Sequence, residues 1–213
     1  MPTLLILTSD ADEYTRLIES ANLPNLKFTS KPEDCDIVLG EPKLIRDVLP
    51  LFSTPKWIQA IYAGVESLMD PVLRRDYILT NARGVFGELM SEYVFGYLLF
   101  HEKRILERIH AQETKQWQRP QSGVLRGKTV GLLGMGSIGA HLASTAKHFG
   151  MTVKGFTRES ESCADVDAYY HDPDILKFVQ GLDYLVTVLP RTADTNKIVN
   201  AELLNALPSH SIF

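Results

Sequence analysis

Three glycines that follow a short apolar run are the residues of this sequence best suited to a chemical task, the binding of phosphate. Residues 129–133 predict a strand, Gly134, Gly136 and Gly139 then complete the spacing G-x-G-x-x-G, and residues 140–149 predict a helix. In such a unit the first glycine permits a tight turn, the second lets the backbone approach a pyrophosphate, and the third lets helix and strand pack closely. The helix start adds free N–H groups and the positive end of the helix dipole.

The segment therefore predicts a dinucleotide-binding turn. The residues that we expect to line it are Gly134, Met135, Gly136, Ser137, Ile138 and Gly139. A glycine turn in some other α/β unit is the alternative, and the flanking strand and helix patterns favour the dinucleotide.

The end of the next predicted strand, residues 152–156, indicates which dinucleotide is preferred. Enzymes that use NAD place Asp or Glu about 20 residues after the glycines, where the carboxylate accepts a hydrogen bond from the ribose 2′-OH. This sequence has Thr157 and Arg158 there, and its acidic residue, Glu159, comes one place late. Because a guanidinium pairs well with a 2′-phosphate, NADP(H) is favoured over NAD(H). The alternative for Arg158 is a solvated loop charge.

The elements that must position these residues follow from an alternation of strand-like and helix-like segments. The predicted strands are residues 3–8, 27–29, 36–39, 57–61, 78–81, 129–133, 152–156, 166–170 and 183–189. The predicted helices include residues 11–21, 42–49, 140–149 and 173–180. This alternation predicts an α/β fold of two doubly wound parallel sheets. We expect a flavodoxin-like substrate domain in residues 1–94 and an incomplete Rossmann domain in residues 95–213.

A long helical pattern joins the two predicted domains. Residues 88–117 carry apolar positions at helical spacing and become charged in the second half. A helix of that length exceeds the usual globular one, and it could bridge domains or form a homodimer interface. Two consecutive helices with a bend are the alternative.

Composition excludes several classes of protein. The formal net charge of −4 gives no argument for nucleic acid or an anionic membrane as partner. Cys35 and Cys163 lie far apart and match no metal-binding or redox spacing, so we expect free thiols in a reducing compartment. The first residues lack a basic signal-peptide region, and no window approaches the ~18 apolar residues of a membrane span. We therefore expect a cytoplasmic protein without a metal site.

Four further segments are informative together. They are residues 57–66 (WIQAIYAGVE), residues 80–87 (TNARGVFG) with 92–94 (EYV), residues 125–128 (LRGK) leading into the glycine turn, and residues 188–192 (VLPRT) with Thr195. These segments resemble the D-isomer-specific 2-hydroxyacid dehydrogenase family, and the likeness is greatest to its glyoxylate and hydroxypyruvate reductase branch. The resemblance runs from about residue 57 to the end and is looser before it.

The resemblance implies two further groups of site residues. The first holds a substrate carboxylate with backbone N–H groups, and its members are Tyr62, Ala63, Gly64 and Val65. A loop of small residues after a strand can turn several N–H donors toward one anion; the alternative is that Gly64 only permits a turn. The second group forms the wall beside the nicotinamide, and its members are Leu189, Pro190 and Thr195.

The resemblance also implies the NAD(P)H-dependent reduction of a small 2-oxo acid by hydride transfer. Such a reaction needs an Arg that polarises the carbonyl and a His, oriented by a carboxylate, that donates a proton. In the family these residues follow the position of Phe213, and the strand with the Arg would begin at Ile212. We therefore assign no catalytic residue, and we expect a truncated chain that is inactive by itself. The alternatives are a catalytically inactive NADP(H)-binding protein or interaction module, and a Rossmann dehydrogenase of the alanine or formate type.

Overall fold

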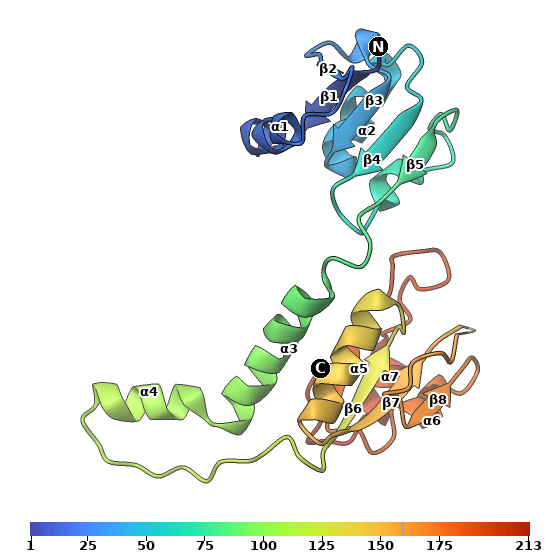
Figure 1. Cartoon of the computed structure of the whole chain (residues 1–213). Helices are drawn as coiled ribbons and strands as arrows, with labels where there is room; N and C mark the ends of the chain where they lie inside the picture. Colours follow the sequence, from blue (N-terminus) through green and yellow to red (C-terminus); the bar gives the residue numbers. More distant parts are fainter. Residues whose placement is uncertain (159) are drawn as a thin grey trace. The chain divides into compact units, whose positions relative to one another are not determined.

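The computed structural model describes residues 1–158 and 160–213, which form two compact units, Met1–Arg83 and Gly84–Phe213. Each unit has one sheet, and every strand pair in both sheets is parallel, which confirms the predicted α/β fold (Figure 1). The expected boundary after residue 94 lies inside helix α3 (Gly87–Glu102). That helix packs against α5 (Ser137–His148) of the second unit, so the division falls before it.

The first unit has the strand order β2-β1-β3-β4-β5, which is the flavodoxin-like order. Its strands are β1 (Thr3–Leu7), β2 (Lys27–Phe28), β3 (Ile37–Gly40), β4 (Trp57–Ala60) and β5 (Ile78–Thr80). Its helices are α1 (Ala11–Ser20) and α2 (Pro42–Val48), with 3₁₀ turns η1 (Pro32–Asp34), η2 (Leu49–Leu51) and η3 (Glu66–Leu68). The predicted segments agree with these elements to within about two residues at each end, the usual uncertainty of element boundaries.

The core of the first unit fixes where β4 ends. Val38 of β3 and Ile58 of β4 are fully buried under Ile45 of α2 and Leu68 of η3. Gly40 lies so close to β1 that a Cβ there would come within 2.2 Å of the carbonyl oxygen of Leu7. This packing holds the carboxyl end of β4, and the loop that follows it, against the neighbouring strands.

The second unit has the strand order β8-β7-β6-β9. In the Rossmann fold this is the order of the three strands of the first half followed by the first strand of the second half. Its strands are β6 (Thr129–Leu133), β7 (Thr152–Phe156), β8 (Ala168–Tyr170) and β9 (Tyr184–Thr187). Its other helices are α4 (Ile105–Glu113), α6 (Ile175–Phe178) and α7 (Ala201–Ala206).

Side chains of β6 alternate between two cores, as expected for a sheet covered on both faces. Val130 and Leu132 belong to the cluster that contains residues of α3 and α5. Leu133 belongs to the cluster that contains residues of α6 and α7. All three are at most 1% exposed. The glycine turn therefore starts from a strand that is held on both sides.

The outer edge of β9 is partly paired by Ile212. The Ile212 amide donates to the carbonyl oxygen of Asp183 at 3.0 Å, and the Leu185 amide donates to that of Ile212 at 2.9 Å. These bonds make a parallel bridge between Ile212 and Tyr184. Ile212 thus occupies the place at which the sequence predicts the start of a further strand.

The prediction of one long helix over residues 88–117 is wrong, and the alternative of two helices is confirmed. Helix α3 ends at Glu102, and α4 runs from Ile105 to Glu113. Between them Arg104 adopts a left-handed conformation (φ 49°), which no α-helix continues through. In Figure 1, α4 extends away from the sheet of its own unit. Within residues 1–158 and 160–213, no helix combines the length and apolar character that a membrane span requires.

A buried ion pair fixes α3 to the base of its sheet. Glu102 is only 6% exposed, accepts a hydrogen bond from the Tyr184 hydroxyl, and lies 3.0 Å from Nζ of Lys128. Burial acts to raise the pKa of Glu102, but the hydrogen bonds from Tyr184 and Lys128 act in the opposite direction and are stronger. The net effect is a pKa below the ordinary value. A Cβ on Gly123 would come within 1.7 Å of the Glu102 carboxylate, so a larger residue there would displace that carboxylate from its partners.

Candidate functional site

The three glycines of the turn between β6 and α5 have three different surroundings. Gly134 has φ +111°, a conformation open to glycine, and a Cβ there would lie 3.1 Å from the backbone of Val188. A Cβ on Gly139 would lie 2.3 Å from the carbonyl oxygen of Gly134. By contrast, a Cβ on Gly136 would meet nothing within 4 Å. The turn is therefore closed on its protein side and open at Gly136, as a backbone that admits a pyrophosphate must be.

The open side of this turn is the N-terminus of α5. Gly136 is the N-cap residue, and no side chain caps the helix. The N–H groups of Ser137, Ile138 and Gly139 precede the first donor of the intrahelical ladder, which is Ala140 to Gly136 at 2.9 Å. These donors and the helix dipole together favour an anion at this position.

The end of β7 lies beside this turn. The Gly134 amide donates to the Phe156 carbonyl at 3.0 Å, which joins the turn to the end of β7. The next residue, Thr157, donates from its amide to the Tyr170 carbonyl at 3.1 Å. The Arg158 side chain is 72% exposed, and its guanidinium lies 3.9 Å from the carboxylate of Asp194. An exposed pair at that distance is weak, so Arg158 can exchange Asp194 for another anion. Glu159 lies outside the described residues.

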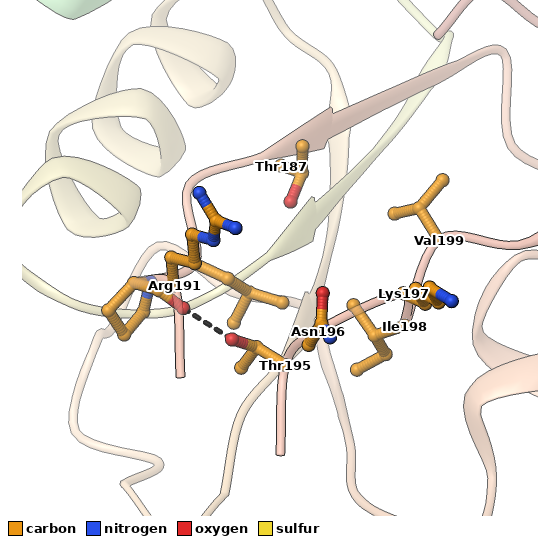
Figure 2. A pocket seen from close by; sticks show the side chains of 9 residues that line it. Thr187, Arg191, Thr195, Asn196, Lys197, Ile198 and Val199 are labelled. Carbon is orange, nitrogen blue, oxygen red and sulfur yellow. Dashed lines mark hydrogen bonds between the residues drawn. The ribbon is translucent and has the colours of Figure 1, made fainter. Parts of the chain in front are cut away.

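The loop after β9 forms the other wall. The Thr195 hydroxyl donates to the Pro190 carbonyl and accepts from the Thr192 amide at 2.8 Å, so the loop folds back on itself. Beside it is a hollow of about 300 Å³, lined by Thr187, Leu189, Pro190, Arg191, Thr195, Asn196, Lys197, Ile198 and Val199. Figure 2 shows Thr187 on the strand opposite Thr195, Asn196 and Ile198 on the returning loop, with the bond from Thr195 dashed.

All the residues predicted to bind the dinucleotide therefore follow the carboxyl ends of three adjacent strands, β7, β6 and β9. Ligands of open parallel sheets bind at this edge. The open backbone at Gly136, the uncapped helix start and the cation on Arg158 suit a pyrophosphate and a further phosphate. The residues present thus fit a phosphorylated dinucleotide.

The predicted carboxylate-binding loop lies in the first unit, directly after β4. The Asn81 side-chain amide donates to the Ala63 carbonyl at 2.6 Å, and the Ala82 amide donates to the Tyr62 carbonyl at 3.3 Å. Among the described residues, no backbone carbonyl of this unit accepts a hydrogen bond from the N–H groups of residues 63–65. The loop is held through its carbonyl groups, and the Glu66 carboxylate lies beside it, 2.7 Å from the position that a Cβ on Gly64 would take.

Sequence reasoning missed several residues that shape these sites. Asn81 lies in a segment that carried the family resemblance, but its amide bond to the loop at residue 63 depends on the pairing of β4 with β5. Asp194 and Asn196 come from a polar loop without a periodic pattern, and nothing in the sequence places them near Arg158 or in the hollow. His171 follows β8 and contacts Thr157, which only the strand order reveals.

These features define the class of the protein. A parallel sheet with a glycine turn leading to an uncapped helix is the Rossmann dinucleotide-binding arrangement. Residues 95–213 match the family described as D-isomer specific 2-hydroxyacid dehydrogenase, NAD binding domain. The chain belongs to the D-isomer specific 2-hydroxyacid dehydrogenase family.

Curated relatives that match the chain include proteins named glyoxylate reductase and glyoxylate/hydroxypyruvate reductase A. The chain is 25% identical to a glyoxylate reductase of Aeropyrum pernix, over 93% of this chain and 60% of that protein. It is 27% identical to a glyoxylate/hydroxypyruvate reductase A of Klebsiella pneumoniae subsp. pneumoniae, over 73% of this chain and 52% of that protein. The chain thus spans between about half and three fifths of the length of these relatives.

Solved structures show the same fold. A D-isomer specific 2-hydroxyacid dehydrogenase family protein from Aeromonas salmonicida is 37% identical, with a TM-score of 0.92 over 99% of this chain and 71% of that one. An NADPH-dependent glyoxylate/hydroxypyruvate reductase from Sinorhizobium meliloti, solved with NADP and sulfate, is 23% identical, with a TM-score of 0.82 over 97% of this chain and 68% of that one. The second likeness is evidence of fold alone.

The different surroundings of two glycines give a test of the phosphate turn. We expect Gly136→Ala to leave the thermal midpoint nearly unchanged but to weaken dinucleotide binding at least about tenfold, because its methyl group would occupy the pyrophosphate position. Gly139→Ala should instead destabilise the protein by about 1–3 kcal/mol through overpacking against Gly134. Calorimetric titration and thermal unfolding measure the two effects. Unchanged affinity in Gly136→Ala would contradict the assignment of the turn.

Proposed function

We propose that this chain provides the cofactor site and the substrate-carboxylate site of an NADPH-dependent reductase of small 2-oxo acids, of the glyoxylate or hydroxypyruvate kind. The nicotinamide, when bound, supplies the hydride that reduces the 2-oxo group to a 2-hydroxy group. The observation that carries the proposal is the glycine turn, closed at Gly134 and Gly139 and open at Gly136. Family membership and the named relatives support the reaction class.

In this proposal the chain's residues bind and orient the two reactants. The N–H groups at the start of α5 hold the pyrophosphate, and Leu189, Pro190 and Thr195 form the wall beside the nicotinamide. The N–H groups of Ala63, Gly64 and Val65 hold the substrate carboxylate. Positioning of this kind lowers the barrier because the reactants no longer lose translational and rotational freedom in the reaction step.

The preference for NADP(H) rests on Arg158. Its guanidinium is exposed at the end of β7, where NAD-specific proteins have a carboxylate. Two solved structures of related fold, from Sinorhizobium meliloti and Xanthobacter autotrophicus, contain NADP or NADPH. The cation, rather than these distant likenesses, is the main argument for the phosphorylated cofactor.

The proton donor is proposed to lie outside these 213 residues. A catalytic His needs a carboxylate that sets its tautomer and pKa. In the described part of the chain, two histidines pair with a carboxylate, His171 with Glu161 and His210 with Asp183. The first pair is at the end of β8, two strands away from the turn after β6, and the second is at the amino end of β9. Neither is beside the loop that would face the nicotinamide.

We further propose that the protein acts in the cytoplasm as a homodimer. Cys35 and Cys163 are free thiols, as expected in a reducing compartment. Large apolar side chains of α3 and α4 are exposed, and they are Leu89, Tyr93, Tyr97, Phe100, Leu106 and Ile109. Contiguous exposed apolar groups of this kind mark protein–protein interfaces.

A charge reversal at the end of β7 tests the cofactor proposal. Wild-type protein should bind NADPH more tightly than NADH, and Arg158→Asp should invert that order by removing the partner of the 2′-phosphate and adding an acceptor for the 2′-OH. We expect at least about a tenfold loss of NADPH affinity, the equivalent of about 1.4 kcal/mol. Arg16→Asp, the same change of charge on the exposed surface of α1, is the control. Equal affinities for both cofactors before and after the change would exclude this role of Arg158.

Turnover tests the placement of the proton donor. Purified residues 1–213 with glyoxylate and NADPH should not consume the reduced cofactor, although they bind it. Consumption that follows the folded protein through purification would show that a donor exists within the chain. The coding sequence after codon 213 separates the alternatives, since downstream Arg, Glu and His codons in frame favour the reductase and their absence favours a cofactor-binding protein without activity.

Sedimentation tests the dimer. We expect a dimer at micromolar concentrations, and we expect Tyr93→Glu with Tyr97→Glu to give a monomer, because both rings are at least 60% exposed on α3. The control is Leu17→Glu, which changes an apolar side chain of similar exposure on α1 and should leave the dimer intact. A monomeric wild-type chain would contradict the proposed interface.

A further inference from the structure

His171 connects two segments at the carboxyl edge of the second sheet. It follows β8 directly, and its Nδ1 lies 2.9 Å from the carbonyl oxygen of Thr157, which follows β7. Its Nε2 lies 2.6 Å from the carboxylate of Glu161, in the same loop as Thr157. The imidazole therefore contacts the loop between β7 and β8 at two positions, residues 157 and 161, which lie on either side of Arg158 in the sequence.

The chemistry of these two contacts determines the charge of the ring. A carbonyl oxygen and a carboxylate oxygen are both acceptors, and a neutral imidazole has only one N–H. Both contacts are therefore satisfied only when His171 is protonated at Nδ1 and Nε2. The hydrogen bond to Glu161 and then that to the Thr157 carbonyl raise the pKa of His171.

The bond to Thr157 acts on Arg158 through the backbone. The Thr157 carbonyl belongs to the peptide group whose nitrogen is that of Arg158, so this bond holds the peptide plane from which Arg158 starts. The Thr157 amide is held at the same time by the Tyr170 carbonyl at 3.1 Å. Thr157 is thus held on both sides by residues 170 and 171 of the neighbouring strand end.

We propose that protonated His171 is a positioning residue that sets the preference for a 2′-phosphorylated dinucleotide. It orients Arg158 through the Thr157 carbonyl and adds a positive charge near the position of the 2′-phosphate, with Glu161 as its counter-charge. The proposal rests on the cofactor site proposed above and adds to it a second residue and a dependence on pH.

The other charged groups of these segments do not replace this role. Arg158 lies near Asp194, which reduces its field before a ligand binds. Asp174 is neutralised by Lys177 at 2.7 Å. The other described carboxylates of residues 157–174 are those of Glu161, Asp165, Asp167 and Asp172, and Asp167 is neutralised by Lys147 at 2.7 Å. A carboxylate next to an imidazole favours its protonated form, and the carboxylate that contacts the His171 ring is that of Glu161.

The sign of the pH dependence follows from linkage. A dianionic phosphate beside His171 favours the protonated ring, so NADPH binds more weakly as the pH rises through the pKa of His171 in the free protein. NADH lacks that phosphate, and its affinity should change much less. The phosphate itself titrates near about pH 6, so the informative range lies above that value.

The experiment measures dissociation constants of NADPH and NADH between about pH 6 and pH 9 by calorimetric titration of the full chain. In the wild type we expect the preference for NADPH to fall by about tenfold across this range, the equivalent of one pKa unit of coupling. In His171→Asn, whose side-chain amide still donates to Thr157 but does not titrate, the preference should be flat. Glu161→Gln should move the fall to lower pH. His148→Asn, an exposed histidine late in α5, should behave as wild type.

Two outcomes would overturn the inference, and they differ from failure of the cofactor proposal. A His171→Asn profile identical to that of the wild type would exclude the role in cofactor preference. An NMR titration of the free chain tests the clamp without any cofactor: His171 should titrate above the ordinary histidine pKa of about 6.5, and Glu161→Gln should lower its midpoint. A midpoint at the ordinary value, unmoved by Glu161→Gln, would overturn the clamp. Absence of binding by both dinucleotides would instead refute the cofactor site itself.

Discussion

The close approach between Gly139 of α5 and the Gly134 carbonyl is the constraint on which the second unit depends. No side chain can stand at residue 139, because a Cβ there would come within 2.3 Å of that oxygen. The contact brings the start of α5 onto the end of β6, and the buried face of α5, with Leu142, Ala143 and Ala146, then lies against the sheet. Helix α3 packs on α5 in turn. The geometry that presents N–H groups to an anion is therefore the same geometry that builds the core.

The strands could be predicted because each one is short, apolar and bounded by turn residues. For β6 and β7 the predicted and observed limits agree, and the alternation with helices was enough to indicate parallel sheets. The long helix could not be predicted correctly, because its interruption depends on distant residues. Lys103 donates to the carbonyl of Gly123, and Arg104 to that of Gln121, so the returning loop stabilises the bend. Periodicity in the sequence indicates the helical faces of both segments, but it does not show that Arg104 between them has a φ of 49°.

Some features of the candidate site could likewise be predicted from the sequence, and others could not. The glycine turn could be predicted because Gly134 and Gly139 meet local steric demands that require glycine, while Gly136, which meets no protein atom, completes the spacing. The contacts of Arg158 could not, because Asp194 and the loop that carries it come from a different strand end. The two contacts of His171 could not be predicted either, since its partners lie 14 and 10 residues earlier in the chain. Spatial order at a sheet edge, rather than sequence distance, decides which polar groups meet.

Both proposed anion sites of the chain would bind their ligands with backbone donors, and this has a physical consequence. The formal net charge of −4 makes the protein as a whole repel an anionic ligand, so affinity must come from short-range groups that act within the Debye length. In the proposed sites, amide groups at the start of α5 and after β4 would supply such attraction without distinguishing one phosphate or carboxylate from another. Discrimination is then left to the few side chains beside them, and at the end of β7 these are Arg158 and His171. Because the backbone sets where the ligand lies, a change in these two side chains can alter which dinucleotide is preferred while the fold stays the same.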